Sequence, residues 1–202
     1  MNKRIIVAIC GASGSIYGIR LLKALLSKPV NIYLIISNAG MEILKHENSY
    51  SGKDLTSFLK DKGVVIHKDA DVNIYEQDDF FAPPASGSFR HDGMVIAPCS
   101  MKTLAAIASG MADNLIHRAA DVSLKEKRPL ILLPRETPLS VIHIMNMHKA
   151  AMSGATIMPP SPSFYFNPKT ISDLVDTVIA RVLDHLKIEH NLVGQWGDKT
   201  VV

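Results

Sequence analysis

The chain of 202 residues contains only two cysteines, few aromatic residues and no long apolar run. Cys10 and Cys99 each end a short apolar stretch, which is unlike a disulfide framework, so we expect a reducing compartment. No run approaches the roughly 20 apolar residues that a membrane span requires. Met1 leads within a few residues into a predicted core strand, which leaves no room for a signal peptide. These absences predict a soluble, cytoplasmic protein without a membrane partner.

Strong charge and metal-binding motifs are also lacking. The formal net charge is only +3, and the 22 Lys and Arg residues form no basic block, which argues against a nucleic-acid partner. Among the eight histidines, His143 and His148 are five residues apart, as are His185 and His190, so each pair points to different helix faces. Neither an H-E-x-x-H motif nor a G-x-S-x-G elbow is present. We expect neither a metal site nor a serine hydrolase.

The sequence does contain an alternation of apolar strands and amphipathic helices. The predicted strands cover residues 5–9, 30–36, 64–67, 94–97, 130–133 and 154–158. The predicted helices cover 19–26, 39–46, a short part of 51–63, 104–108, 114–127, 139–153 and 171–186. The acidic segment 69–79 is expected to be irregular, and in 139–153 Met145, Met147 and Met152 fit core packing. The alternation predicts a Rossmann-like α/β fold, a three-layer αβα sandwich with a mostly parallel sheet.

No second domain is visible, so we expect one domain over residues 1–202. Its tail, residues 190–202, holds the only tryptophan, Trp196. A polar tail with one large aromatic residue is expected to dock near the site or on a neighbouring subunit.

A glycine-rich turn, Gly11-Ala12-Ser13-Gly14, follows the first strand. The next helix start would offer backbone N–H groups to an anionic phosphate, and Ser13 and Ser15 add hydroxyls for a phosphate or a flavin edge. The turn is not G-x-G-x-x-G, and the second strand ends in Ser37 rather than an acidic residue. Both departures favour a mononucleotide such as FMN over NAD.

Polar residues end three further predicted strands: Ser37, then Ser100 to Thr103, then Arg135 with Glu136. Because parallel strands bring their carboxyl ends to one edge of a sheet, we expect these turns to form one site with Ser13.

Two further features leave alternatives open. Arg118 and Lys125 are seven positions apart and share a helix face, which is either a solvated basic face or an anion site. The proline-rich and aromatic loop 80–89 is either anchored to its own domain or a neighbour, or walls a flat apolar ligand site.

Several motifs together resemble the UbiX-type flavin prenyltransferases, formerly labelled aromatic-acid decarboxylases, of the flavin-containing cysteine decarboxylase-like superfamily. They are Gly11-Ala12-Ser13-Gly14, Pro83-Pro84-Ala85-Ser86-Gly87-Ser88, Ala97-Pro98-Cys99-Ser100, Asn114-Leu115-Ile116 with Arg118-Ala119-Ala120-Asp121, Pro134-Arg135-Glu136-Thr137-Pro138, and Pro159-Pro160 through Phe164-Tyr165. The resemblance runs in order from Arg4 to about Trp196. The loop Phe89–Gly93 matches weakly and receives no catalytic role.

The resemblance implies a metal-independent transfer of a dimethylallyl group from dimethylallyl monophosphate to reduced FMN. It implies that FMN is bound by Gly11, Ala12, Ser13, Ser37, Ser100, Met101, Lys102, Thr103 and Arg135. It implies that the prenyl phosphate is bound by Arg118, Lys125, Tyr165 and Arg181. It implies that Glu136 and Ser13 relay protons, and that Glu47 and Trp196 are further active-site residues. The resemblance also implies that the product is prenylated FMN and that a UbiD-type decarboxylase is the functional partner. It further implies a dodecamer with sites where subunits meet.

Elementary chemistry agrees with this expectation. Cleavage of an allyl phosphate leaves negative charge on the phosphate, which Arg118, Lys125 and Arg181 could stabilise without a metal. Two alternatives are an FMN-dependent cysteine decarboxylase of the same superfamily and a non-catalytic FMN-binding accessory subunit. This sequence lacks the catalytic histidine and the Asn-rich Met loop of the cysteine decarboxylases, which argues against the first alternative. The presence of Glu136 together with the cationic residues argues against the second.

Overall fold

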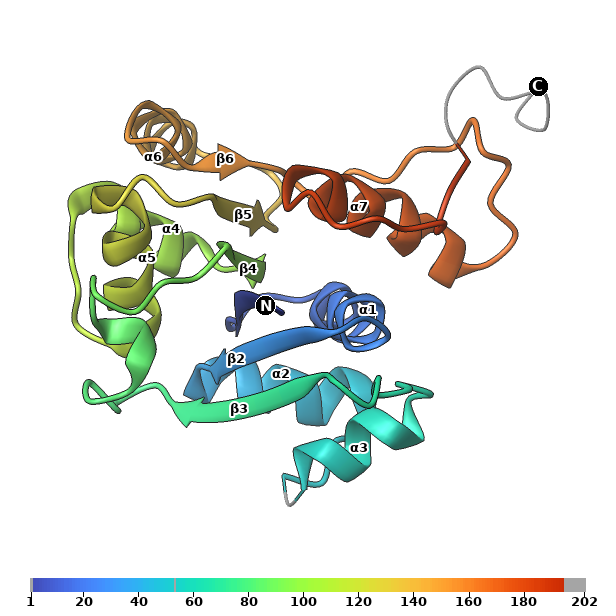
Figure 1. Ribbon diagram of the computed structural model, residues 1–202. Helices are drawn as coiled ribbons and strands as arrows, with labels where there is room; N and C mark the ends of the chain where they lie inside the picture. Colours follow the sequence, from blue (N-terminus) through green and yellow to red (C-terminus); the bar gives the residue numbers. More distant parts are fainter. Residues whose placement is uncertain (1, 53, 195–202) are drawn as a thin grey trace. The chain divides into compact units, whose positions relative to one another are not determined.

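The computed structural model describes residues 2–52 and 54–194 (Figure 1). The chain forms two compact units, Met1–Pro159 and Pro160–Val202. The first unit holds the sheet, and the second holds α7 (Ile171–His185). The expectation of one domain over residues 1–202 stays a prediction.

A sheet of six parallel strands forms the centre of the first unit, counted over the described residues, in the order β3-β2-β1-β4-β5-β6. The strands are β1 (Lys3–Ile9), β2 (Val30–Ile36), β3 (Asp71–Glu76), β4 (Gly93–Cys99), β5 (Leu130–Pro134) and β6 (Thr156–Ile157). In β1, Ile5 lies opposite Ile32 of β2 and Gly93 of β4. Ile5 to Ile9 are at most 1% exposed, because both faces of this strand are covered.

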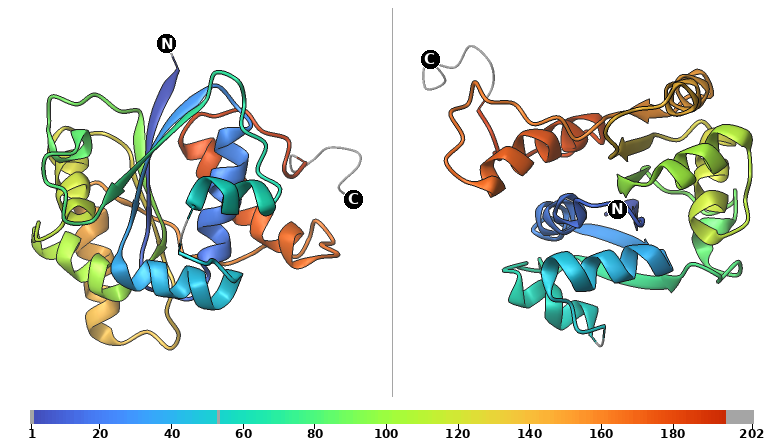
Figure 2. Two further views of the ribbon diagram at one scale, coloured as in Figure 1. Left: turned by 90° about the horizontal axis from the view of Figure 1, so that it is seen from below. Right: turned by 180° about the vertical axis from the view of Figure 1, so that it is seen from behind.

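Helices cover both faces of this sheet. They are α1 (Ser15–Leu26), α2 (Asn38–Asn48), α3 (Leu55–Asp61), α4 (Met101–Ser109), α5 (Leu115–Lys125) and α6 (Val141–Met152), with a 3-10 turn at Pro83–Ala85. Figures 1 and 2 show α1 on one side of the sheet and α4 and α5 on the other. On the latter side, Ile6 and Ala8 of β1 pack in one apolar cluster with Leu104 of α4 and Ala119 of α5. The predicted three-layer αβα architecture is confirmed.

The predicted strand at residues 64–67 is wrong. The third strand is β3, Asp71–Glu76, inside the segment that we expected to be irregular. It is an edge strand paired with β2, and its side chains are exposed or half-buried throughout. An edge strand needs no continuous apolar run, so its acidic composition concealed it.

The core packing predicted for the methionines of α6 is also largely wrong. Met145 and Met152 are 64% and 76% exposed, whereas Met147 packs against the apolar core. The reason is that α6 buries a narrow face, centred on Ala150, against its neighbour α4.

In the second unit, the N-terminus of α7 is fixed by a capping box. The Thr170 side chain accepts a hydrogen bond from the Asp173 backbone N–H, and the Asp173 carboxylate accepts one from the Thr170 N–H. None of the helices in the described part of the chain has both the length and the apolar character that crossing a bilayer requires.

Candidate functional site

The carboxyl ends of β2, β1, β4 and β5 lie side by side, because these strands are parallel neighbours. Backbone bonds join the turns that follow them: Ser37 N–H donates to Ile9 O at 3.0 Å, and Arg135 N–H donates to Cys99 O at 3.2 Å. The expected convergence of the polar strand ends is confirmed. We call this edge, formed by residues 10–15, 37–40, 100–103 and 135–136, the rim.

Arg135 and the glycine-rich turn, far apart in sequence, meet at the rim. Arg135 Nε donates a hydrogen bond to the backbone oxygen of Ser13 at 3.1 Å. Glu136 follows as an exposed side chain, and its Oε1 accepts a bond from Thr137 N–H at 3.0 Å. The structure therefore places the Arg135 guanidinium on the Ser13 turn, and Glu136 is the next residue along the chain.

The N-terminus of α1 is occupied by a carboxylate of the protein itself. Gly14, at φ 101°, turns the chain so that its N–H lies 3.0 Å from Glu47 Oε1. Glu47 Oε2 accepts bonds from Ser15 N–H at 2.9 Å and Ser15 Oγ at 2.7 Å, and Asn48 Nδ2 donates to the same Oγ at 2.6 Å. The Ser15 hydroxyl is buried and used within the protein, so it is not the ligand group that the sequence suggested.

These contacts shift the ionisation of Glu47. Burial by itself raises its pKa, but the hydrogen bonds from Ser15, Ser13 and the backbone N–H of Gly14 outweigh that effect and hold the pKa below its ordinary value. Glu47 is thus a carboxylate at neutral pH. Glu47 satisfies the α1 amides. The helices α2 and α4 also begin at the rim, and their N-termini could receive an anionic group.

The N-termini of α2 and α4 are capped by the two serines that the sequence singled out. Ser37 Oγ accepts a bond from Gly40 N–H at 2.9 Å, and Ser100 Oγ accepts one from Thr103 N–H at 3.2 Å. Met101 and Lys102 form the first turn of α4. Both helix starts carry partial positive charge at the rim, which suits an anionic group.

Small residues let backbone approach closely at the rim. A Cβ at Gly11 would lie 2.4 Å from Ala39 Cβ, and one at Gly40 would lie 2.4 Å from Ile9 O. A larger residue at either position would push α2 away from β1. Beside these turns, burial raises the pKa of the Cys10 thiol to about 11, and that of Cys99 well above its ordinary value. Both free cysteines are therefore protonated and inert.

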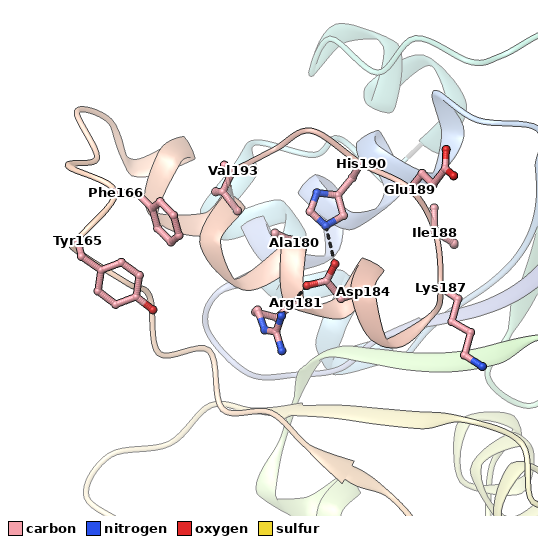
Figure 3. A pocket seen from close by; sticks show the side chains of 11 residues that line it. Tyr165, Phe166, Ala180, Arg181, Asp184, Lys187, Ile188, Glu189, His190 and Val193 are labelled. Carbon is pink, nitrogen blue, oxygen red and sulfur yellow. Dashed lines mark hydrogen bonds and ion pairs between the residues drawn. The ribbon is translucent and has the colours of Figure 1, made fainter. Parts of the chain in front are cut away.

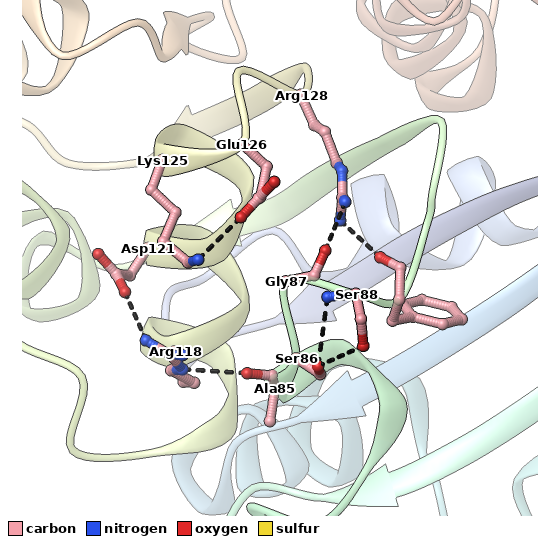
Figure 4. Close-up of polar contacts among 10 residues, drawn as sticks. Ala85, Ser86, Gly87, Ser88, Arg118, Asp121, Lys125, Glu126 and Arg128 are labelled. Carbon is pink, nitrogen blue, oxygen red and sulfur yellow. Dashed lines mark hydrogen bonds and ion pairs between the residues drawn. The ribbon is translucent and has the colours of Figure 1, made fainter.

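Arg118 and Lys125 share one face of α5, and that face meets the loop at residues 83–89 (Figure 4). Arg118 Nε donates to Ala85 O at 3.0 Å, and its Nη1 lies 2.7 Å from Asp121 Oδ2. A Cβ at Gly87 would lie 2.9 Å from Lys125 Nζ. The two cations thus flank the loop instead of forming a purely solvated face.

Within one chain, Lys125 lies away from the rim. It ends α5 shortly before β5 begins at Leu130, whereas Arg135 directly follows the carboxyl end of β5. A strand of this length spans about 16 Å. Lys125 therefore lies toward the amino-terminal ends of the strands, and Arg135 lies at their carboxyl ends. Within the first unit, Lys125 is therefore not brought together with Arg135 and Glu136.

In the second unit, Tyr165 and Arg181 line one pocket (Figure 3). Arg181 Nη1 is 2.6 Å from Asp184 Oδ2, and His190 Nε2 is 3.0 Å from Asp184 Oδ1. The two predicted substrate residues of this unit therefore line the same pocket. Trp196 lies outside the described residues, as does the tail beyond Gly194.

The loop at residues 83–89 is anchored to its own unit by a residue that the sequence did not single out. Arg128 Nη1 and Nη2 donate to Phe89 O at 2.5 Å and Gly87 O at 2.7 Å. The Phe89 ring packs edge-on against Tyr33 at 4.7 Å between centroids. Of the two alternatives, the anchored loop is confirmed, while Phe81 is fully exposed. The wall of a ligand site stays a prediction.

Gln77 is a second residue that sequence reasoning missed. Its side-chain oxygen accepts a bond from Asn38 N–H at 3.1 Å, and its backbone oxygen accepts one from Leu115 N–H at 2.7 Å. It thereby joins the starts of α2 and α5. Nothing in its local sequence marks it.

Over residues 2–52 and 54–194, no three His, Cys, Asp or Glu side chains are grouped to hold a metal ion.

Comparisons with known proteins were made for the whole chain. Residues 1–183 match the family model described as Flavoprotein. The flavin prenyltransferase UbiX of Halalkalibacterium halodurans is 45% identical over 198 residues, which cover 96% of this chain and 93% of that protein.

Two solved structures are similar over nearly the full length. The crystal structure of AnUbiX (PadA1) in complex with FMN and dimethylallyl pyrophosphate superposes with a TM-score of 0.87 at 42% identity, covering 98% of both chains. A UbiX-like decarboxylase from Escherichia coli O157:H7, described as dodecameric and FMN-dependent, gives a TM-score of 0.85 at 43% identity and covers 96% of this chain and 98% of that one.

Proposed function

The chain belongs to the flavoprotein family and, within it, to the flavin prenyltransferases, and from this we propose that it transfers a dimethylallyl group from dimethylallyl monophosphate to reduced FMN. The product, prenylated FMN, would serve a UbiD-type decarboxylase. The observation that carries the proposal is the rim, where Arg135 is bonded to the Ser13 turn with Glu136 beside it. A cation, a carboxylate residue and close-approach glycines thus follow neighbouring strands at one edge of the sheet.

The residues of the rim fit FMN. Gly11, Ala12 and Ser13 would let backbone approach the ring system, and Arg135 would hold its polar edge. The phosphate would lie at the starts of α2 and α4, near Ser37 and the segment 100–103, because Glu47 already bonds the α1 amides. Reduced FMN, when bound, supplies the electron-rich N5 and C6 atoms that take up the five-carbon group.

The cations would act on the leaving phosphate. Arg118, Lys125 and Arg181 would stabilise its growing negative charge, and Tyr165 would donate a hydrogen bond to it. Because Lys125 lies toward the other edge of the sheet from Arg135, a second copy of the chain would have to supply one of the two groups. This supports a homo-oligomer, and a dodecamer is proposed from the relative described as one.

Glu136 would move the protons. Ring closure at C6 releases a proton, and an exposed carboxylate next to Arg135 can accept it, with the Ser13 hydroxyl as the intermediate donor and acceptor. Glu47 would support this role by fixing the turn that carries Ser13.

Release of phosphate under anaerobic conditions tests the proposal. With reduced FMN and dimethylallyl monophosphate, the protein should release one inorganic phosphate for each flavin consumed. Dimethylallyl pyrophosphate should be a poorer donor. Glu136→Gln should slow phosphate release or product formation while FMN still binds. Binding of FMN without any phosphate release would instead favour the accessory subunit, and carbon dioxide from a cysteine peptide would favour the cysteine decarboxylase.

A further inference from the structure

A cavity of about 360 Å³ lies in the first unit, and none of its lining residues belongs to the rim. It is bounded by the carboxyl-terminal residues of β2 and β3, by Met41 of α2 and by the segment 50–55 that leads into α3. We call it the edge cavity, because β3 is an edge strand of the sheet. A cavity of about 150 Å³ is enough to bind benzene, so the edge cavity can hold one aromatic ring with a short chain.

The buried part of the edge cavity is largely apolar and is held in place by two helices. Ile36, Tyr50 and Leu55 line it and are at most 7% exposed. The Tyr50 ring packs against the Phe58 ring of α3 at 4.8 Å between centroids, and Tyr50 N–H donates to Leu44 O of α2 at 3.4 Å. The site is therefore formed before any ligand arrives, which lowers the cost of binding.

A hydroxyl in this lining lacks a hydrogen-bond partner. Tyr50 is only 6% exposed, and within residues 2–52 and 54–194 its hydroxyl makes no hydrogen bond. Buried polar groups are normally hydrogen-bonded, so a ligand in the edge cavity can supply the missing partner. Burial, together with the nearby charge of Asp54, raises the pKa of Tyr50, so the group is a neutral phenol that can accept a hydrogen bond.

The charged groups that line the edge cavity in the described part of the chain are both carboxylates. Asp54 and Glu76 are exposed, and neither forms an ion pair with a Lys or Arg among those residues. The Ser57 hydroxyl donates to the Asp54 carboxylate and holds its pKa below its ordinary value, so Asp54 is ionised at neutral pH. The neighbouring cation, Lys45, is already paired with Glu42 at 2.7 Å. The edge cavity therefore favours a positively charged ligand.

We propose that the edge cavity binds a primary ammonium compound that carries one aromatic ring on a short chain. The ring lies on the apolar residues, where it removes hydrocarbon surface from water. The ammonium group donates a hydrogen bond to the Tyr50 hydroxyl, and the Asp54 and Glu76 carboxylates attract its charge. The same carboxylates repel an anion such as FMN. The inference concerns a second site and does not rest on the proposed prenyl transfer.

Three compounds of similar size test the charge and the apolar part of the inference. The full-length protein, with and without FMN, would be titrated with 2-phenylethylamine, 2-phenylethanol and phenylacetate in ligand-observed NMR. We expect saturable binding of the amine with a Kd of roughly 1 mM or below. The uncharged alcohol should bind at least about tenfold more weakly, and the anionic phenylacetate should not bind. FMN should leave the Kd of the amine unchanged, because the rim contributes none of the lining.

Two variants with matched controls test the residues. Tyr50→Phe keeps the ring and removes the hydroxyl, so it should raise the Kd of the amine about tenfold. Tyr33→Phe is its control, because Tyr33 lies outside the lining. Glu76→Gln covers the case in which Tyr50→Phe fails to fold, since Glu76 is exposed, and it should raise the Kd several-fold. Its control, Glu42→Gln, removes a carboxylate outside the lining and should bind like wild type.

Each contrary outcome would overturn the inference. Absence of saturable amine binding, equal affinity for the alcohol, displacement of the amine by FMN, or folded variants of Tyr50 and Glu76 that bind like wild type would do so. None of these readouts depends on flavin chemistry. Failure of the edge cavity as a site and failure of the prenyl transfer can therefore be told apart.

Discussion

The replacement Glu47→Gln tests how the carboxylate on α2 supports the glycine-rich turn. Glu47 accepts bonds from Gly14 N–H at 3.0 Å, Ser15 N–H at 2.9 Å and Ser15 Oγ at 2.7 Å. Glutamine has the same size as glutamate and keeps one acceptor oxygen. It has no charge, and its NH2 group would face the donors of Gly14 and Ser15 without being able to accept a hydrogen bond from them. The variant should therefore lose the charge-dependent part of these bonds and keep the packing.

The expected loss is modest because Glu47 is an exposed side chain. Hydrogen bonds to a buried charge contribute about 1.5–3 kcal/mol, and water screens the interaction here. A negative charge at an exposed helix N-terminus contributes about 0.3–1 kcal/mol. We therefore expect Glu47→Gln to lower the free energy of unfolding by about 1 kcal/mol at pH 7.

The pH dependence gives the sign of the effect. The folded pKa of Glu47 is below its ordinary value of 4.5, so its stabilisation is fully present above that pH. It is lost as the pH falls through the lower folded pKa. The stabilities of wild type and Glu47→Gln should accordingly converge in acid.

Urea unfolding at fixed protein concentration between pH 3 and 7 would measure both properties. Glu42→Gln is the matched control, because Glu42 lies on the same helix and its carboxylate pairs with exposed Lys45 at 2.7 Å. The control should stay within about 0.5 kcal/mol of wild type. If Glu47→Gln were as stable as wild type at pH 7 and followed the same acid profile, the bonds at the turn would contribute nothing measurable.

Three further predictions concern other parts of the first unit. Burial lowers the pKa of His91 from 6.5 to about 4, so stability should fall by up to about 3 kcal/mol from pH 7 to 4; urea unfolding of His91→Phe should lack this loss, and equal profiles would contradict it. Arg135→Ala removes the bond to Ser13 O and should weaken FMN binding about tenfold in a fluorescence titration, whereas an unchanged Kd would refute its role. Arg128→Ala should lower the free energy of unfolding by about 2 kcal/mol and speed amide hydrogen exchange in residues 83–89, because both bonds to this loop are lost. The control Lys127→Ala, which replaces an exposed side chain, should change neither property. Equal exchange in both variants would show that Arg128 does not hold the loop.

The sequence was sufficient where burial is continuous. The strands at residues 5–9 and 30–36 are apolar on both faces, and they fix the parallel sheet whose order brings Ser37 and Arg135 to one rim. The location of the candidate site then follows from the rule that parallel strands place their carboxyl ends at one side of the sheet.

The sequence was insufficient where a long-range contact decides the outcome. β3 is held at the edge by β2, so its own residues carry no apolar pattern. The exposure of Met145 follows from the narrow face that α6 buries, which periodicity cannot reveal. The same holds for Ser15, whose hydroxyl is taken by Glu47 and Asn48 from another helix. The resemblance assigns Lys125 and Arg135 to one site, but the two residues lie toward opposite ends of the strands. Only the topology shows this separation.

The mass of the flavin after turnover tests the central claim most directly. The purified protein would be incubated without oxygen with reduced FMN and dimethylallyl monophosphate, and the flavin then extracted for mass spectrometry. We predict a flavin heavier by one five-carbon unit, formed by wild type and formed more slowly by Glu136→Gln. Recovery of unmodified FMN from wild type that had bound both compounds would contradict the proposed prenyl transfer.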